Sequence, residues 1–292
     1  MNKKVLITGC NGQLGRDLQE AATRHPALQL LCTDMHNLDL TCNHDVTAYV
    51  RNHHPAFIIN CAAYTAVDKA EEEEDKAFAI NAAAVQNLAE AAGECQSHLI
   101  HISTDYVFDG TKTTPYTEED TLNPQSAYGR SKLAGEKAAL SHPQTMVIRT
   151  AWLYTCEGNN FVNTMLRLGI ERPTLNVVND QHGSPTYAAD LAEAILAIIE
   201  HVITGTKKFV PGVYHYTNEG VCTWFDFAQR IMQLGHRSCT LHPVTTADYP
   251  TKAARPAYSI LSKEKIKTIY GLAIPSWEDA LLRCFQKKKC VT

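Results

Sequence analysis

Short apolar runs alternate with amphipathic stretches along the first half of the chain. The short runs predict strands, and the longer stretches with apolar residues at every third or fourth position predict helices. The predicted strands are Val5–Thr8, Leu28–Cys32, Phe57–Cys61, Leu99–Ile102 and Met146–Arg149. The predicted helices are Gln13–Thr23, Asp45–Asn52, Asp75–Ala92 closed by Gly93, and Ala127–Leu140 with Ser126 as its N-cap. This alternation predicts an α/β fold, a Rossmann-like doubly wound parallel sheet covered by helices on both faces.

The second half is less regular. Two apolar helices are predicted, Ala188–His201 and Thr223–Leu234, and prolines interrupt much of the remainder. Short elements of this kind suit a smaller C-terminal lobe that closes over a site. We therefore expect a dinucleotide-binding domain over residues 1–155, to which some later segments return, and a mainly substrate-binding lobe over residues 156–292.

Composition excludes several classes of function. The formal net charge is −4 with scattered Lys and Arg, so no nucleic-acid partner is expected. No apolar stretch approaches the length of about 20 residues that a membrane helix needs. The 10 cysteines include no C-x-x-C pair, which argues for small buried residues in a cytoplasmic protein rather than for disulfides or a metal site.

A glycine-rich turn lies between the first strand and the first helix. Gly9, Gly12 and Gly15 have the spacing that lets backbone N–H groups approach a pyrophosphate at a helix N-terminus. Asp34 follows at the end of the second strand, where a carboxylate accepts hydrogen bonds from the adenine ribose. The alternatives are an ordinary glycine-rich turn and a strand-end aspartate. The combination favours binding of a dinucleotide, NADH or NADPH.

Tyr128 precedes Lys132 by four residues on a predicted helix, so the two share one helix face. The pair is weak evidence alone, because a chain with 12 tyrosines produces such spacings by chance. Thr104, at the end of the fourth strand, would lie at the same edge of the sheet. Together they predict hydride transfer between a nicotinamide and a carbonyl or alcohol carbon. Tyr128 would handle the proton, its pKa lowered by Lys132 and by the cofactor's charge.

Several longer motifs surround these residues, and through them the chain resembles the extended short-chain dehydrogenase/reductase family. The motifs are Thr8–Gly15, Ala62–Asp68, Ser103–Gly110, Tyr128–Glu136, Arg149–Trp152, Gly158–Phe161, Asn179–Thr186 and Arg255-Pro256. The resemblance implies an NAD(P)H-dependent oxidoreductase that reduces the 4-keto group of dTDP-4-dehydro-β-L-rhamnose to give dTDP-L-rhamnose, for a cell-surface polysaccharide. Its partner would be the dTDP-sugar substrate.

The same resemblance implies roles for individual residues. Thr104, Tyr128 and Lys132 would be catalytic. The cofactor would meet Gly9, Gly12, Gln13, Leu14, Asp34, Asp39, Leu40, Ala62, Ala63, Tyr64, Tyr128 and Lys132. The sugar nucleotide would meet Val67, Thr104, Asp105, Tyr106, Trp152, Asn160 and Arg255. Trp152 could instead belong to the core between the lobes. Arg255 could instead form a surface salt bridge, although a guanidinium suits a diphosphate.

Two alternatives to the reductase remain open from the sequence. One is a sugar-nucleotide epimerase or dehydratase of the same fold, and the other is a regulatory subunit that binds the cofactor without catalysis. Some family members also dimerise through magnesium. The matching carboxylates here are Asp17 and Asp190, and no third one is evident near the C-terminus, so we expect no metal site and leave a homodimer open.

Overall fold

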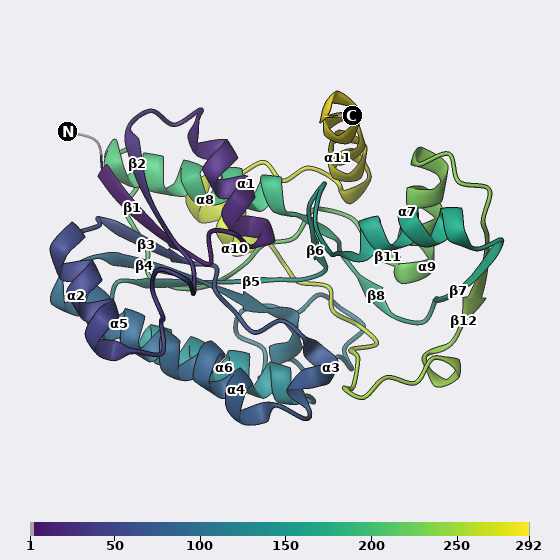
Figure 1. Cartoon of the computed structure of the whole chain (residues 1–292), viewed down its shortest axis with the longest axis horizontal. Helices are drawn as coiled ribbons and strands as arrows, with labels where there is room; N and C mark the ends of the chain where they lie inside the picture. The colour runs from purple at the N-terminus through teal and green to yellow at the C-terminus, as the bar shows by residue number, and fades with distance from the viewer. Residues whose placement is uncertain (1–2, 292) are drawn as a thin grey trace.

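The structure is a computed structural model that describes residues 3–291, with side chains described for residues 3–288. A six-stranded parallel sheet forms the centre of the larger lobe, which we call the sheet lobe (Figure 1). Its order is β10-β5-β4-β3-β1-β2. The bounds are β1 Lys3–Thr8, β2 Leu28–Thr33, β3 Phe57–Asn60, β4 His98–Thr104, β5 Thr145–Thr150 and β10 Gly212–His215. The predicted doubly wound sheet is confirmed, and its five predicted strands are all present.

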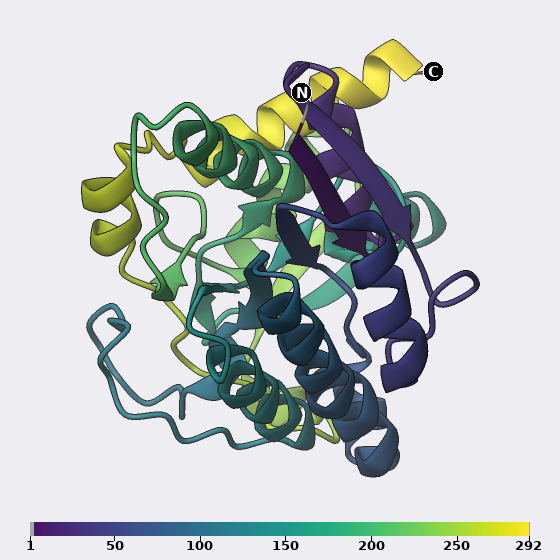
Figure 2. The same ribbon diagram turned by 90° about the vertical axis from the view of Figure 1, so that its left-hand side faces the viewer.

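Helices cover both faces of the sheet (Figures 1 and 2). One face carries α1 Gln13–Ala22, α8 Ala188–Ile203 and α10 Glu264–Tyr270. The other carries α2 Asn43–His53, α3 Val67–Ala70, α4 Glu74–Phe78, α5 Ala84–Glu94 and α6 Ala127–Leu140. Strand β3, the second half of β1 and most of β4 are buried between these layers, as a parallel sheet requires, and their centres are apolar. Segments α8, β10 and α10 come from the second half of the chain but pack into the core of the sheet lobe.

A second core lies in what we call the small lobe. It is built by α7 Phe161–Glu171, α9 Trp224–Leu234, α11 Trp277–Val291 and the parallel pair β7 Thr174–Val178 and β12 Thr240–Val244. Shorter strands complete the chain: β6 Leu153–Tyr154, β8 His182–Gly183, β9 Thr186–Tyr187 and β11 Cys222–Thr223. Two 3-10 turns, η2 Asp105–Val107 and η3 Thr246–Asp248, follow β4 and β12. Among residues 3–291, no helix is long and apolar enough to cross a membrane.

The predicted helix Asp75–Ala92 differs from the observed one. A π-helical turn, η1 Ala79–Ala83, separates α4 from α5, and α5 continues to Glu94. Gly93 therefore lies within the last turn and does not close the helix; the chain reverses at Gln96, which has φ +55°. The π turn pushes the Asn81 carbonyl against α6, where only Gly135 leaves room for it. Periodicity cannot reveal such a turn, because its cause is a contact with another helix.

A buried ion pair joins α6 to the sheet beside the end of β4. The Arg149 guanidinium donates to both carboxylate oxygens of Glu136, at 2.9 and 2.7 Å, and the Ser103 hydroxyl donates to the same carboxylate at 2.5 Å. Both charged side chains are 2% exposed. Because the two charges neutralise each other in a fixed geometry, the pair holds the strand end that carries Ser103 against α6.

Removing one partner of this pair should destabilise the fold strongly. We expect Glu136→Gln to lower the free energy of unfolding by about 3–5 kcal/mol, because it leaves a buried guanidinium without its counter-charge. Urea denaturation followed by circular dichroism measures the change. Glu171→Gln is the matched control, because it breaks an exposed Arg167 pair on α7 and should cost at most about 1 kcal/mol. Equal losses in the two variants would contradict this view of the buried pair.

Candidate active site

The glycine turn after β1 lies directly against the chain that leaves β3. Gly9 has φ +66°, and a Cβ placed on it would lie 2.7 Å from the Ala62 backbone nitrogen. A Cβ on Gly15 would lie 2.5 Å from the Gly9 carbonyl oxygen. Side chains are therefore excluded at both positions. The first turn of α1 is left open to a ligand that approaches along the backbone, as a pyrophosphate does.

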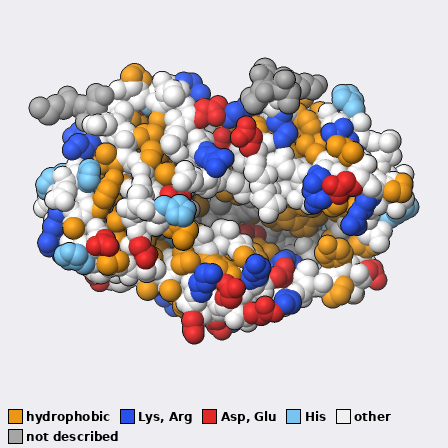
Figure 3. Space-filling model, in the orientation of Figure 1, with side chains coloured by type: hydrophobic (Ala, Val, Ile, Leu, Met, Phe, Trp, Pro, Cys, Tyr) orange, Lys and Arg blue, Asp and Glu red, His pale blue; other side chains and the backbone are white. Residues whose placement is uncertain are grey.

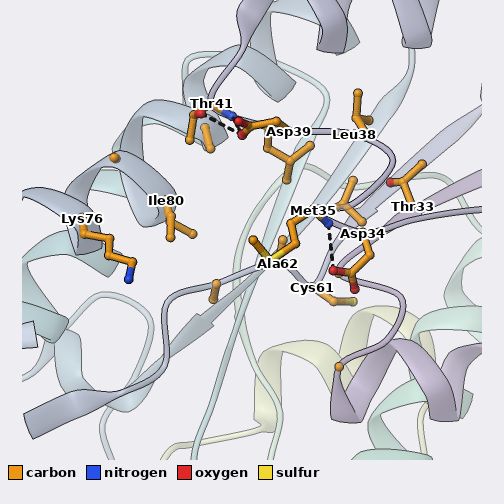
Figure 4. A pocket seen from close by; sticks show the side chains of 17 residues that line it. Thr33, Asp34, Met35, Leu38, Asp39, Thr41, Cys61, Ala62, Lys76 and Ile80 are labelled. Carbon is orange, nitrogen blue, oxygen red and sulfur yellow. Dashed lines mark hydrogen bonds between the residues drawn. The ribbon is translucent and has the colours of Figure 1, made fainter. Parts of the chain in front are cut away.

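A cavity of about 480 Å³, cavity 1, opens beside this turn between the ends of β1, β2 and β3 (Figure 4). The Asp34 carboxylate stands at its wall and accepts from the backbone N–H groups of Asn11, at 3.1 Å, and Met35, at 2.8 Å. Asp39 lies further along the same wall and accepts from Thr41, which lowers the pKa of its carboxyl. Of the predicted cofactor residues, Gly9, Gly12, Asp34, Asp39, Leu40, Ala62 and Ala63 line cavity 1.

A larger cavity of about 690 Å³, cavity 2, shares Gly12, Cys61 and Ala63 with cavity 1. It lies at the carboxyl edge of the sheet, and Figure 3 shows this face of the molecule hollowed between the two lobes. The predicted residues that line it are Gly12, Gln13, Leu14, Ala63, Val67, Thr104, Asp105, Tyr106, Tyr128, Lys132 and Trp152. The three predicted catalytic residues thus meet in a cavity that continues cavity 1.

Tyr128 and Lys132 lie on α6, whose N-cap is Ser126: its hydroxyl oxygen accepts from the Gly129 N–H at 3.1 Å. The Lys132 ammonium donates to the Ile102 carbonyl at 2.7 Å, and burial lowers its pKa to about 8. Burial raises the pKa of Tyr128 to about 12, against an opposing hydrogen bond with Thr104. In the chain alone, removing the phenol from water therefore outweighs this hydrogen bond, whereas the predicted lowering also depends on the charge of a bound cofactor.

Asp105 is a buried acid at the wall of cavity 2. Its Oδ1 accepts from the Thr104 hydroxyl at 2.9 Å, whereas its Oδ2 is buried with no hydrogen-bond partner among the described residues. Burial raises the pKa of this carboxyl to about 7. An unsatisfied buried oxygen next to Thr104 is suited to bind a polar group that enters the cavity.

A third cavity of about 360 Å³, cavity 3, lies between the lobes and shares Tyr106 and Trp152 with cavity 2. Trp152 has φ +50° and stacks on Trp224 with ring centroids 3.6 Å apart. A Cβ on Gly183 would lie 2.5 Å from the Trp152 ring, so glycine there makes room for the indole. Trp152 therefore belongs both to the packing between the lobes and to the wall of the site.

Three predicted site residues form contacts within the protein. The Tyr64 hydroxyl donates to Glu73 at 2.9 Å, and its side chain lines none of the three cavities. Asn160 also lines none of them: it caps α7 and donates to Gln13 Oε1 at 3.2 Å, so its contact with a ligand would be indirect. Arg255 lines cavity 3 and also forms an ion pair with Asp68 at 2.6 Å. The two alternatives for Arg255, salt bridge and site residue, are therefore compatible.

Some residues that hold the site in place were not identified from the sequence. Asn60 accepts from the Thr8 hydroxyl at 2.7 Å and from the Ala62 N–H at 3.1 Å, which ties β1 to the loop after β3. Asn81 donates to Ser131 at 2.9 Å and accepts from the Tyr64 N–H at 2.8 Å. Asn60 ends an apolar strand, which is a signal for a strand-edge polar role. Asn81 gives no signal, because it acts through the π turn.

The carboxylates of Asp17 and Asp190, which were considered as magnesium ligands, form hydrogen bonds and ion pairs with other side chains of the protein. Asp190 accepts two hydrogen bonds from Arg283, at 2.6 and 2.8 Å. Asp17 is buried, accepts from the Thr155 hydroxyl at 2.8 Å and lies 3.4 Å from the Lys287 ammonium. In the part of the chain that the structure describes, no three His, Cys, Asp or Glu side chains are grouped to hold a metal ion.

A family model described as RmlD substrate binding domain matches residues 3–290. The chain belongs to this family. It is 43% identical over 286 residues to a dTDP-4-dehydrorhamnose reductase of Aggregatibacter actinomycetemcomitans, which covers 95% of this chain and 97% of that protein. It is 40% identical over 284 residues to a probable dTDP-4,6-dihydroxy-2-methyloxan-3-one 4-ketoreductase of Streptomyces antibioticus, at 96% and 94% coverage. A solved dTDP-4-dehydrorhamnose reductase of Bacillus anthracis in complex with NADP superposes with a TM-score of 0.93 at 42% identity, covering 98% of this chain and 100% of that one.

The buried Asp105 carboxyl should make stability depend on pH. Its pKa is raised from 3.8 to about 7 on folding, so the folded chain binds this proton more tightly than the unfolded chain. The stabilisation is present below about pH 4 and is lost as pH rises through 7. We expect the unfolding midpoint of the wild type to fall relative to that of Asp105→Asn between pH 4 and pH 8, measured by thermal denaturation.

Asp109→Asn is the control for this measurement. A hydrogen bond from the Tyr116 hydroxyl lowers the pKa of Asp109, so its effect changes only as pH falls below about 4. Its midpoint difference should stay constant over the same range. A constant difference for Asp105→Asn as well would show that Asp105 is not held protonated by burial.

Proposed function

We propose that this protein is an NAD(P)H-dependent oxidoreductase that reduces the 4-keto group of dTDP-4-dehydro-β-L-rhamnose to give dTDP-L-rhamnose. The observation that carries the proposal is that Thr104, Tyr128 and Lys132 line one cavity that continues the dinucleotide cavity at the glycine turn. Among the relatives, the name of the Streptomyces antibioticus protein also describes a 4-ketoreductase of a dTDP-linked substrate. Two relatives that are each about 40% identical to this chain therefore have names that describe reduction of a 4-keto group on a dTDP-linked substrate.

The residues of the two joined cavities fit a nicotinamide dinucleotide, either NADPH or NADH. Gly9, Gly12 and Gln13 would hold the pyrophosphate at the start of α1, and Asp34 would meet the adenine ribose. Leu14, Ala63 and Lys132 would lie along the nicotinamide half. When bound, the reduced nicotinamide supplies the hydride that the substrate carbon accepts. The solved Bacillus anthracis relative, whose structure contains NADP, supports this assignment.

Tyr128 is the proton donor in this proposal. Reduction of a ketone consumes a proton, so the phenol must be protonated when the substrate binds. The raised pKa of about 12 keeps that proton on Tyr128 at neutral pH. The Thr104 hydroxyl lies beside it and would hydrogen-bond the same substrate oxygen. As that oxygen gains negative charge, it withdraws the proton from Tyr128, and the buried Lys132 ammonium stabilises the phenolate that remains.

The sugar nucleotide would extend from cavity 2 into cavity 3. Val67, Asp105 and Tyr106 would contact the sugar, with the unsatisfied Asp105 oxygen accepting from a hydroxyl group. Trp152 and Arg255 would meet the nucleotide, and Asn160 would act through Gln13. In this assignment the sheet lobe, largely residues 1–155, binds the cofactor, and the small lobe, largely residues 156–292, completes the substrate site. The proposal includes a cytoplasmic location and leaves a homodimer open.

Tyr128→Phe tests the proposed chemistry. Without the proton donor we expect kcat to fall about 10²–10⁴-fold. The dissociation constant for NAD(P)H, followed by nicotinamide fluorescence, should stay unchanged, because the phenyl ring keeps the cavity wall. Tyr258→Phe is the control, since it removes a tyrosine hydroxyl outside the three cavities.

The stoichiometry of the wild type separates the reductase from the other functions of this fold. One NAD(P)H should be oxidised per molecule of 4-keto sugar nucleotide consumed. Turnover without net cofactor oxidation would indicate an epimerase or a dehydratase. Full activity in Tyr128→Phe would rule out the proposed proton donor.

A further inference from the structure

A segment that runs between the lobes forms one wall of cavity 3. We call residues 246–256 the strap, because it leaves the small lobe after β12 and crosses to the sheet lobe. At the small-lobe end, the Thr246 hydroxyl donates to Asp180 at 2.6 Å, and Gln181 donates to Thr246 at 3.0 Å. Strap residues Tyr249, Thr251, Arg255 and Pro256 line cavity 3. The position of the strap therefore determines the shape of that cavity.

At the sheet-lobe end, the strap is held by one carboxylate of α3. Asp68 Oδ1 accepts from the Ala253 backbone N–H at 3.0 Å, and Asp68 Oδ2 accepts from Arg255 Nη2 at 2.6 Å. Both carboxylate oxygens are thus used on the strap. A second link, between Lys252 and Glu72, joins two side chains that are each about 60% exposed, so water screens it. Asp68 is also one of the residues that line cavity 3, whereas Glu72 is not.

The Arg255 guanidinium stands near the junction of cavities 2 and 3. Burial raises the pKa of the Tyr106 hydroxyl, and the nearby Arg255 charge opposes that rise. The Tyr106 side chain is a wall shared by the two cavities. The Arg255 side chain is only 20% exposed. One N–H group donates to Asp68 and another makes a long contact of 3.4 Å to the Ala253 carbonyl, so further N–H groups remain for an anionic ligand.

We propose that Asp68 is a positioning residue for the sugar-nucleotide substrate, which holds the strap and the Arg255 guanidinium where the diphosphate passes from cavity 2 to cavity 3. The proposal rests on the proposed function, because a sugar nucleotide places its diphosphate between the sugar at the catalytic residues and the base. It assigns to Asp68 a part in substrate affinity that acts through Arg255 and the strap, on which both of its carboxylate oxygens are used.

Two effects of Asp68 oppose each other. Its negative charge weakens the attraction between Arg255 and a diphosphate, but its two hydrogen bonds restrict an arginine and a long segment that would otherwise lose conformational freedom on binding. The charge effect is small, because the Asp68 side chain is 42% exposed and screened by water. Ordering a flexible arginine and its backbone on binding costs more. The restriction of Arg255 and the strap therefore outweighs the opposing charge of Asp68, and removal of Asp68 should weaken substrate binding.

The test compares Asp68→Ala and Asp68→Asn with the control Glu72→Gln. Calorimetry measures the binding of dTDP and of thymidine, and steady-state kinetics give kcat and KM for the 4-keto sugar nucleotide. We expect Asp68→Ala to raise the dissociation constant of dTDP and the substrate KM about tenfold, with kcat within about twofold of wild type. Asp68→Asn keeps an acceptor for the Ala253 N–H and should show a smaller rise. Thymidine binding, NAD(P)H binding and the Glu72→Gln variant should be unchanged.

A double-mutant cycle separates positioning from general damage to the fold. If Asp68 acts mainly through Arg255, then Asp68→Ala should have little further effect on dTDP binding in an Arg255→Ala background. Additive effects, or tighter dTDP binding by Asp68→Ala, would overturn the proposal while leaving the proposed function intact. If the wild type neither binds dTDP nor reduces the sugar nucleotide, the proposed function is wrong and the role of Asp68 falls with it.

Discussion

The close approach of two backbone segments is the constraint on which the site depends. Strands β1 and β3 are neighbours, and the order of strands reverses between them, so the loops after them diverge to opposite faces of the sheet. Gly9 and Ala62 nevertheless remain in contact at the start of these loops. Gly12, Cys61 and Ala63 then form a wall common to cavities 1 and 2. Backbone, more than side chains, thus builds the place where a dinucleotide fits.

Burial then sets the protonation states of the catalytic cavity. It raises the pKa of Tyr128 and of Asp105 and lowers that of Lys132, because each charged form loses its water. The Glu136 charge opposes the effect on Lys132 and is itself balanced by Arg149. For a reductase this arrangement is favourable. In the proposed mechanism, the proton that the product requires is held on Tyr128 until a substrate oxygen with growing negative charge withdraws it.

The sequence predicts those parts of the structure that depend on local pattern. The strands follow from apolar runs, and the glycine turn follows from its spacing, because both are local requirements of the backbone. Cavity-lining residues such as Asp34, Thr104 and Lys132 follow from their positions at strand ends and on one helix face. The π turn at Ala79–Ala83 could not be predicted, since its cause is a contact between the Asn81 carbonyl and Gly135 on another helix.

Asn160 shows that a local role can be recognised from the sequence more easily than a contact with a residue far along the chain. Its place before an apolar helix is a recognisable N-cap signal, and the structure gives it that role, with its amide also bound to Gln13 of the glycine turn. Likewise, the ion pair between Arg255 and Asp68 joins residues 187 positions apart, which no local pattern indicates.

The contact of Asn160 with Gln13 and that of Arg255 with Asp68 both reach the segments beside the proposed cofactor site. Gln13 belongs to the turn that would hold the cofactor, and Asp68 lies in α3, which follows the loop after β3. Asn160 therefore ties the first helix of the small lobe to one cofactor loop, while Arg255 ties the strap to the other. Both links are polar, so small movements can break and remake them without exposing an apolar core. The small lobe and the strap are thus linked to the two segments that the proposal assigns to the dinucleotide site. A change in those loops on cofactor binding would reach the walls of the substrate cavity directly.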